Sequence, residues 1–168
     1  MKGLLYITNY DGNRKISHVN EILRNANTFN LDVDVIIYTT EELRLEDHDN
    51  LNIEVVIKPK VFSNSKYAAS WQPEPEFIWI HRSDILTKID KYDIFIHVED
   101  DVNLTKGNID QFIKYSFDNK FDGYIIGNVI YEKDGDDFIL PQFHAHFKGI
   151  GEIIKLNGEF FMKPKNKH

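Results

Sequence analysis

The sequence contains no cysteine among its 168 residues, so disulfide bonds, thiolate zinc sites and a cysteine nucleophile are excluded. No apolar run approaches the ~20 residues that a membrane-spanning helix needs. No glycine-rich phosphate loop of the GxGxxG or GxxxxGK(S/T) kind occurs. Basic residues are the minority, since 20 Lys and Arg against 27 Asp and Glu give a net charge of -7. This balance argues against a protein that binds a nucleic-acid backbone.

Apolar side chains are plentiful, at 42% hydrophobic and 13% aromatic residues, which predicts a folded globular protein. The length suits one domain with a real core, and we expect a single domain over residues 1–168. The first residues, 1–7, are too short for a signal peptide and read as the start of a strand. The expected location is the cytoplasm or the periphery of a membrane.

The first half of the chain alternates short apolar runs with segments of helical periodicity. This alternation predicts an α/β fold with a mostly parallel sheet and right-handed crossovers. The predicted strands are residues 4–7, 31–38, 53–57 and 94–98, the predicted helices are 16–26 and 76–89, and a short helical turn is expected at 41–45.

The second half is predicted to begin with a helix whose N-cap is Asn108, followed by Gln111 in a variant of the capping box. Further strands are expected at 123–131 and 138–140, with a solvated acidic turn at 134–137. Asn157-Gly158 between two apolar runs is a strong hairpin signal, so a C-terminal β-hairpin is predicted over 152–162.

Three consecutive acids, Glu99, Asp100 and Asp101, follow the strand at 94–98, whose apolar composition predicts a central strand of a covered sheet. Neighbouring carboxylates repel one another, and a divalent cation relieves that repulsion because hard cations prefer carboxylate oxygens. In open α/β sheets, ligands bind beyond the carboxyl ends of the strands, which is where these acids fall. The alternative is an ordinary acidic junction between a strand and a solvated loop.

The run Ile96-His97-Val98-Glu99-Asp100-Asp101-Val102, followed by a polar loop and an amphipathic helix, resembles the metal-binding strand end of GT-A-type nucleotide-sugar glycosyltransferases. Their DXD motif often occurs as Glu-Asp-Asp, notably in the N-acetylglucosaminyltransferase I group. An Arg-containing helix start before the acids, here Arg82, is a further point of similarity. The resemblance covers residues 3–131 and implies a Rossmann-like, mostly parallel sheet of the nucleotide-diphospho-sugar transferase type.

The resemblance implies a role for each acid. Asp101 would be the direct ligand of Mn²⁺ or Mg²⁺, Asp100 would support it, and Glu99 would face the ribose. Arg82 would approach the diphosphate or the base, and Asp84 would lie near the base. For Arg82 and Asp84, the alternative is an ordinary position on a helix surface.

The loop after the first strand would cradle the base and ribose, through Thr8, Asn9 and Arg14; Asn9 could instead cap the following helix. Related enzymes often complete the metal shell with a histidine from the second half, and His146 would fill that role. Because His144 and His146 are alternate residues, a strand would place both on one face. The alternative is two unrelated surface histidines.

The function implied by the resemblance is metal-dependent transfer of a sugar from a nucleotide-diphosphate sugar to an unknown glycan, lipid or protein acceptor. Residues 1–101 would form the nucleotide-binding half and 102–168 part of the acceptor half. Such domains are usually longer, so an amino-terminal fragment or a minimal member is expected, and the sequence does not locate the catalytic base. Two alternatives remain open, a non-catalytic binding module of the same fold and a metal-dependent phosphohydrolase.

Overall fold

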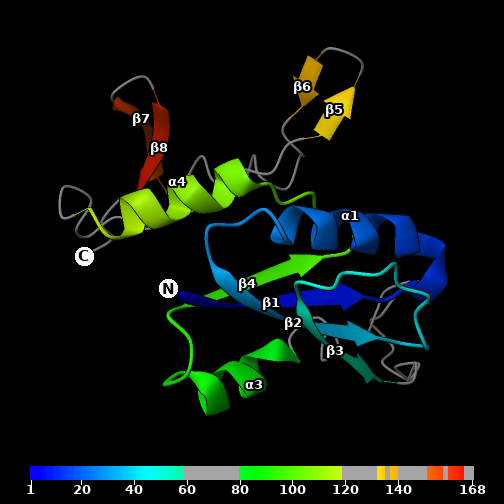
Figure 1. Cartoon of the computed structure of the whole chain (residues 1–168). Helices are drawn as coiled ribbons and strands as arrows, with labels where there is room; N and C mark the ends of the chain where they lie inside the picture. Colours follow the sequence, from blue (N-terminus) through cyan, green and yellow to red (C-terminus); the bar gives the residue numbers. More distant parts are fainter. Residues whose placement is uncertain (59–79, 119–131, 135–136, 140–150, 157–158, 165–168) are drawn as a thin grey trace, which may run out of the picture. The chain divides into compact units, whose positions relative to one another are not determined.

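The computed structural model describes residues 1–58, 80–118, 132–134, 137–139, 151–156 and 159–164 (Figure 1). The chain divides into two units, Met1–Ile109 and Asp110–His168. This division falls after Ile109, a few residues beyond the boundary at 101 that the resemblance implies. The first unit carries the predicted nucleotide-binding half.

Four parallel strands form the sheet of the first unit, in the order β3-β2-β1-β4. Each neighbouring pair is parallel, which confirms the α/β class and is compatible with a Rossmann-like fold. The chain runs outward from β1 to β2 and β3, and then returns to place β4 on the other side of β1. The strands are β1 (Lys2–Asn9), β2 (Asp32–Thr39), β3 (Asn52–Ile57) and β4 (Ile94–Glu99).

Strand β1 is the most deeply buried element, because seven of its eight residues are buried. Side chains alternate between the two faces of a strand. Leu4 and Tyr6 pack on one face in a cluster with Ile36 and Tyr38 of β2. The odd-numbered residues of β1 face the other side, where the long amphipathic helix α1 (Ile16–Ala26) covers the sheet.

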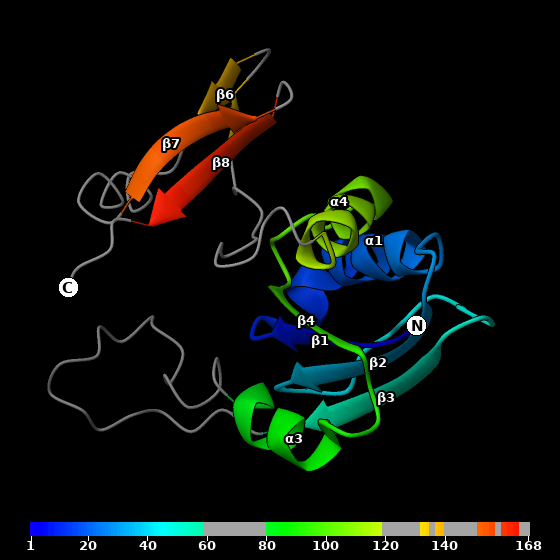
Figure 2. The same cartoon turned by 90° about the vertical axis from the view of Figure 1, so that its left-hand side faces the viewer.

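Helix α3 (His81–Lys88) lies on the face of the sheet opposite α1, so the sheet has a helix on each face (Figures 1 and 2). Ile80 and Ile85 pack against the Tyr6 cluster. The predicted helix began at residue 76, but residues 59–79 lie outside the described part of the chain.

One prediction about the first unit is wrong. Residues 41–45 form no helical turn, because Asn13 holds this segment by accepting the backbone N–H of Arg44 and donating to Glu41. The prediction that strand β4 is central concerns a sheet whose further predicted strand, 123–131, lies outside the described residues; among the four described strands β4 is not central. It lies at one end of their order and is only partly buried, whereas β1 is central and buried.

The predicted N-cap of α4 (Lys106–Ser116) is also wrong, by three residues. Asn108 lies inside the helix, and Thr105 precedes it. The Thr105 hydroxyl accepts the backbone N–H of Asn108 at 3.4 Å, and the Asn108 side chain accepts the backbone N–H of Thr105 at 3.0 Å. This reciprocal pair is a capping box with Asn in the place of the usual Glu or Gln.

The second unit contains two antiparallel strand pairs among its described residues. One joins β5 (Glu132–Asp134) to β6 (Asp137–Ile139), and the other joins β7 (Gly151–Leu156) to β8 (Glu159–Pro164). The strand predicted at 123–131 and the Asn157-Gly158 turn lie outside the described residues. Across the described parts of the chain, no helix is long and apolar enough to cross a membrane.

Candidate functional site

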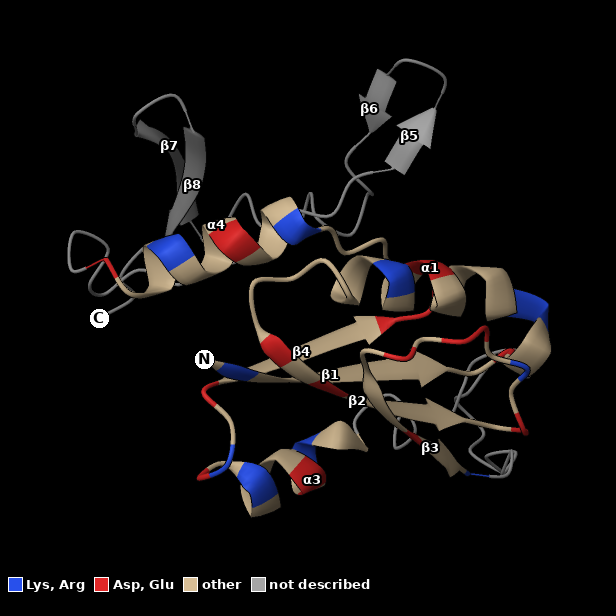
Figure 3. Cartoon of the chain, in the orientation of Figure 1, with Lys and Arg blue, Asp and Glu red and all other residues tan. Residues whose placement is uncertain are grey.

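The carboxyl ends of β1 and β4 meet at the point where the strand order reverses. Thr8 pairs with Glu99 in the parallel register, and the Asp100 backbone N–H donates to the Thr8 carbonyl at 3.1 Å. Figure 3 shows the acidic segment that follows β4 at this edge. In open α/β sheets a crevice forms at such a reversal, and ligands bind there. The acids and the loop after β1 therefore share one edge of the sheet.

The acids do not all lie on the same side of the sheet. Glu99 is in register with Thr8, and both belong to the face that α3 covers. Asp100 follows the last residue of β4 and lines a pocket on the α1 side. The pocket has a volume of about 140 Å³. Its lining residues are His18, Glu21, Ile22, Asp100, Asp101, Val102 and Asn103.

Helix α1 supplies one wall of this pocket, and a hydrogen-bonded asparagine joins that wall to the acidic turn. Asn103 donates to Glu21 at 3.1 Å and accepts from the Asn25 side chain at 2.8 Å. His18 precedes Glu21 by three residues, so both side chains lie on one face of the helix. The turn after β4 is thereby held against α1.

Asp100 is the electrostatically unusual group of the pocket. Its Oδ2 atom is buried and has no hydrogen-bond partner. Burial, and then the neighbouring Asp101, raise the pKa of Asp100 to about 6, against smaller opposing effects of Lys15 and His18. Burial and Asp101 also raise the pKa of Glu99. A buried carboxylate that lacks a hydrogen-bond partner and lies beside another acid favours a ligand that brings positive charge.

These features fit a divalent cation in part. Asp100 and Asp101 provide two carboxylates at one pocket, the donor type that Mn²⁺ and Mg²⁺ prefer. Within the described residues, no three His, Cys, Asp or Glu side chains come together in a group that could hold a metal ion. Mg²⁺ usually keeps several waters and binds through one or two carboxylates plus the phosphates of a ligand, so two carboxylates suit such a shared site.

In the loop after β1, the side chains of Thr8 and Asn9, which were predicted to bind the nucleotide, make hydrogen bonds within the protein. Asn9 is fully buried; its amide donates to the Gly12 carbonyl at 3.1 Å, and its oxygen accepts from Thr39 at 3.3 Å. Because Asn9 bonds a carbonyl, it does not cap the following helix. The Thr8 hydroxyl lies 3.0 Å from His97 Nε2. Arg14 is exposed in the 3₁₀ helix η1 (Gly12–Lys15) that continues into α1.

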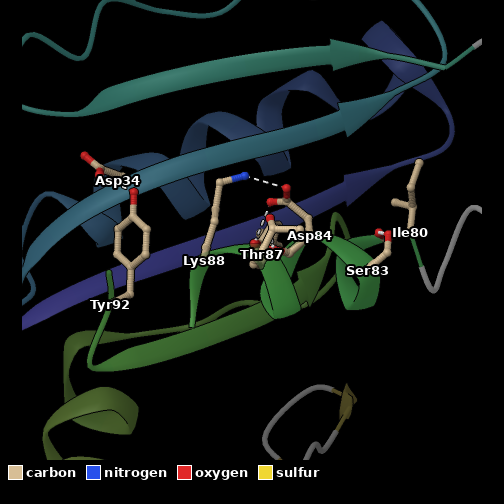
Figure 4. Close-up of polar contacts among 8 residues, drawn as sticks. Asp34, Ile80, Ser83, Asp84, Thr87, Lys88 and Tyr92 are labelled. Atoms are coloured by element: carbon tan, nitrogen blue, oxygen red, sulfur yellow. Dashed lines mark hydrogen bonds and ion pairs between the residues drawn. The ribbon is translucent and has the colours of Figure 1, made fainter. Parts of the chain in front are cut away.

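Asp84 of helix α3 has two partners within the protein, Tyr6 and Lys88, whereas the resemblance implied a position near the base. The Asp84 carboxylate accepts from the Tyr6 hydroxyl at 2.7 Å. It also pairs with Lys88 at 2.5 Å, one helical turn away (Figure 4). Farther along the same face of the sheet, the Tyr92 hydroxyl donates to Asp34 at 2.7 Å. The Asp84 contacts anchor α3 to β1, so a structural role accounts for this residue.

The start of α3 brings a second pair of residues to the carboxyl edge. His81 stacks on His97 with ring centroids 3.8 Å apart, and His81 is buried. Burial, His81 and Arg82 together lower the pKa of His97 to about 4. The exposed Arg82 thus acts electrostatically on His97, on the α3 side of β4. His146, and His144 with it, lie outside the described residues.

Several residues at this edge were not predicted from the sequence. The helical spacing of His18 and Glu21 places them on one face of α1, but the sequence does not show which strand end that face meets. His81 and His97 read as isolated histidines, and only the topology brings their rings together. Asn103 joins Glu21 to the acidic turn across a wide separation in sequence.

Comparison of the chain with family models, with curated proteins and with solved structures finds no match in any of the three.

Proposed function

We propose that the chain binds a nucleotide-diphosphate sugar at the carboxyl edge of β1 and β4 and takes part in metal-dependent transfer of its sugar. The acceptor is a glycan, a lipid or a protein. The fold proposed is of the nucleotide-diphospho-sugar transferase type, with the β7–β8 strand pair as its C-terminal hairpin. One observation carries the proposal: Asp100 and Asp101 share a pocket at the switch point of a parallel sheet, and an Asp100 oxygen is buried without a partner.

The chain's own residues would divide the work at this edge. Asp100 and Asp101 would hold Mn²⁺ or Mg²⁺. A cation bound there would neutralise charge on the diphosphate leaving group. Arg82 would contribute a permanent positive charge to the diphosphate from the α3 side, because a guanidinium stays protonated and binds phosphate oxygens in pairs.

The nucleoside would lie along the loop that follows β1. Glu99 would accept from ribose hydroxyl groups, since it pairs in register with Thr8 at the end of the sheet. Arg14 is exposed next to this edge and would contact the phosphates or the base. The side chains of Thr8 and Asn9 would shape the loop, because their hydrogen bonds go to His97, Gly12 and Thr39.

The first experiment measures binding of UDP and GDP to the full chain by calorimetry, with Mn²⁺ and with EDTA. We expect binding that requires Mn²⁺ and that Asp101→Asn weakens by about tenfold or more, because a neutral amide replaces a charged cation ligand. Asp90→Asn is the matched control, because Asp90 is an exposed acid before β4, at the opposite edge of the sheet.

The results distinguish the proposed transferase from its alternatives. Metal-dependent binding that Asp101→Asn abolishes and Asp90→Asn preserves supports the nucleotide site. Hydrolysis or transfer of the sugar from a panel of nucleotide sugars then supports the enzyme, and tight binding without turnover identifies a binding module. Release of phosphate from a simple monoester indicates the phosphohydrolase. Absence of any metal-dependent nucleotide binding refutes the proposal.

A further inference from the structure

The turn between β1 and η1 has the backbone shape that many α/β proteins use to hold phosphate. Gly12 adopts a left-handed conformation with φ of 58°, and Asn13 follows it with its backbone N–H pointing out of the turn. Successive N–H groups in such a turn form a concave site for an anion, and in dinucleotide-binding folds the first strand-to-helix turn receives the pyrophosphate.

In this chain a carboxylate from another loop already occupies that position. Glu41 Oε1 accepts the backbone N–H of Asn13 at 2.7 Å and its side-chain amide at 3.2 Å. A Cβ atom added at Gly12 would overlap the Glu41 carboxylate. The left-handed backbone is what favours glycine at this position, and the Glu41 carboxylate lies in the space beside it.

The segment that carries Glu41 is held in place by neighbouring polar contacts. Asn13 donates to the Glu42 carbonyl at 2.9 Å and accepts the Arg44 backbone N–H at 3.0 Å. The Thr40 hydroxyl donates to the Tyr10 carbonyl at 3.1 Å. The loop after β2 is thus tied to the loop after β1 on both sides of Glu41. These contacts explain why residues 41–45 depart from helical geometry.

A free diphosphate would meet negative charge at this turn. The Glu41 carboxylate accepts the Asn13 backbone N–H that a phosphate oxygen would need, and its negative charge repels a phosphate. Asp11 lies close enough to Asp100 to raise its pKa, and Lys15 of η1 lies close enough to lower it. A phosphate that approaches without a cation has no described backbone site open to it at this turn.

We propose that Glu41 is a built-in anion that blocks the phosphate position of the β1–η1 turn and so makes phosphate binding depend on a cation at Asp100 and Asp101. The part of this inference that concerns the cation rests on the function proposed above. The part that concerns Glu41 stands on the geometry of the turn. Glu41 is thus a specificity-determining residue, which selects a metal-bound diphosphate over a free one.

The test measures binding of inorganic pyrophosphate to the full chain by calorimetry in EDTA, for the wild type, Glu41→Ala and Glu42→Ala. Glu42 is the matched control, because it is an exposed neighbour of the same charge. We expect Glu41→Ala to bind pyrophosphate about tenfold or more tightly than the other two proteins, because one charge-assisted hydrogen bond becomes available. The Asn13 amide signal in ¹H–¹⁵N spectra should shift on titration of this variant alone.

Thermal unfolding first establishes that each variant is folded. If Glu41→Ala is not, Glu41→Gln replaces it, with Glu42→Gln as its control; the neutral amide keeps an acceptor for Asn13 and should give a smaller gain. The inference is overturned if the Glu41 variant binds pyrophosphate no better than the Glu42 variant, or if it gains affinity while the Asn13 amide signal does not move.

Failure of this inference and failure of the proposed function give different results. If the wild type does not bind UDP or GDP with Mn²⁺ but Glu41→Ala gains metal-free pyrophosphate binding, Glu41 blocks the turn and the cation part is refuted. If the wild type binds UDP with Mn²⁺ and Glu41→Ala gains nothing in EDTA, the nucleotide site stands and the role of Glu41 is refuted.

Discussion

His97 is a half-buried imidazole at the point where α3, β1 and β4 meet. It stacks on His81, lies within hydrogen-bonding distance of the Thr8 hydroxyl, and has a pKa lowered from 6.5 to about 4 by burial, His81 and Arg82. Between these two pH values the unfolded chain binds more protons at this residue than the folded chain. Protonation of His97 therefore costs the folded chain nothing above pH 6.5, and the free energy of unfolding decreases as the pH falls from 6.5 to about 4.

Replacing His97 should reduce the pH dependence of stability. We expect His97→Gln to lose less unfolding free energy than the wild type between pH 7.5 and 4.5, by about 1 kcal/mol, since partial exposure weakens the full effect of the pKa shift. Urea denaturation at the two pH values measures the difference. Asn27→Gln, at an exposed residue without a titratable side chain, should retain the wild-type dependence, and equal pH dependence in all three proteins would contradict the prediction.

At the scale of elements, the N-terminus of α4 depends on the reciprocal bonds between Thr105 and Asn108. Thr105→Ala should lower the unfolding free energy by about 1 kcal/mol, because it removes the acceptor for the Asn108 backbone N–H. Asn108→Ala should cost a similar amount, and the double variant less than the sum, because the two side chains act as a pair. Chemical denaturation measures all three.

Ser116→Ala is the control for the capping box, since Ser116 is exposed at the last residue of the same helix. Its effect should stay within about 0.5 kcal/mol. A Thr105→Ala variant as stable as Ser116→Ala would show that the capping box contributes nothing to the stability of the chain.

The elements that the sequence predicted well are those whose signal is local. Apolar periodicity indicated β1, α1, β2 and β3 to within two residues of their ends, because each buries one continuous stripe or run. The errors arose where a distant partner decides the local structure. Asn13 and Glu41 are far apart in sequence, and their hydrogen bonds prevent a helical turn that composition alone favours.

The candidate site shows the same limit. A strand that ends in three acids is visible in the sequence, and parallel topology places it beside the loop after β1, as Thr8 and Glu99 show. The sequence does not reveal that Asp100 turns toward His18 and Glu21, because that depends on how α1 packs on the sheet. Helical spacing makes Lys88 an expected partner of Asp84, but the sequence does not show the Tyr6 hydroxyl that donates to it.

At the scale of the whole molecule, charge sets the conditions under which a nucleotide can bind. The chain carries a net charge of -7, and the acids at the carboxyl edge add a local excess of negative charge. A nucleoside diphosphate is itself an anion, so both the net charge of the chain and the local negative charge at the carboxyl edge oppose its approach without a metal. A protein that binds phosphate through basic side chains would show the opposite behaviour.

The proposed site therefore predicts a change of sign in the salt dependence of nucleotide binding. In EDTA, the weak affinity for UDP should rise between about 25 and 250 mM NaCl, because screening reduces repulsion. With Mn²⁺ it should fall over the same range, because screening weakens the attraction between the cation and Asp100 and Asp101. Uridine, which lacks phosphates, should show little dependence in either condition. Metal-free UDP affinity that falls with salt would indicate a basic phosphate site and contradict the cation-bridged arrangement.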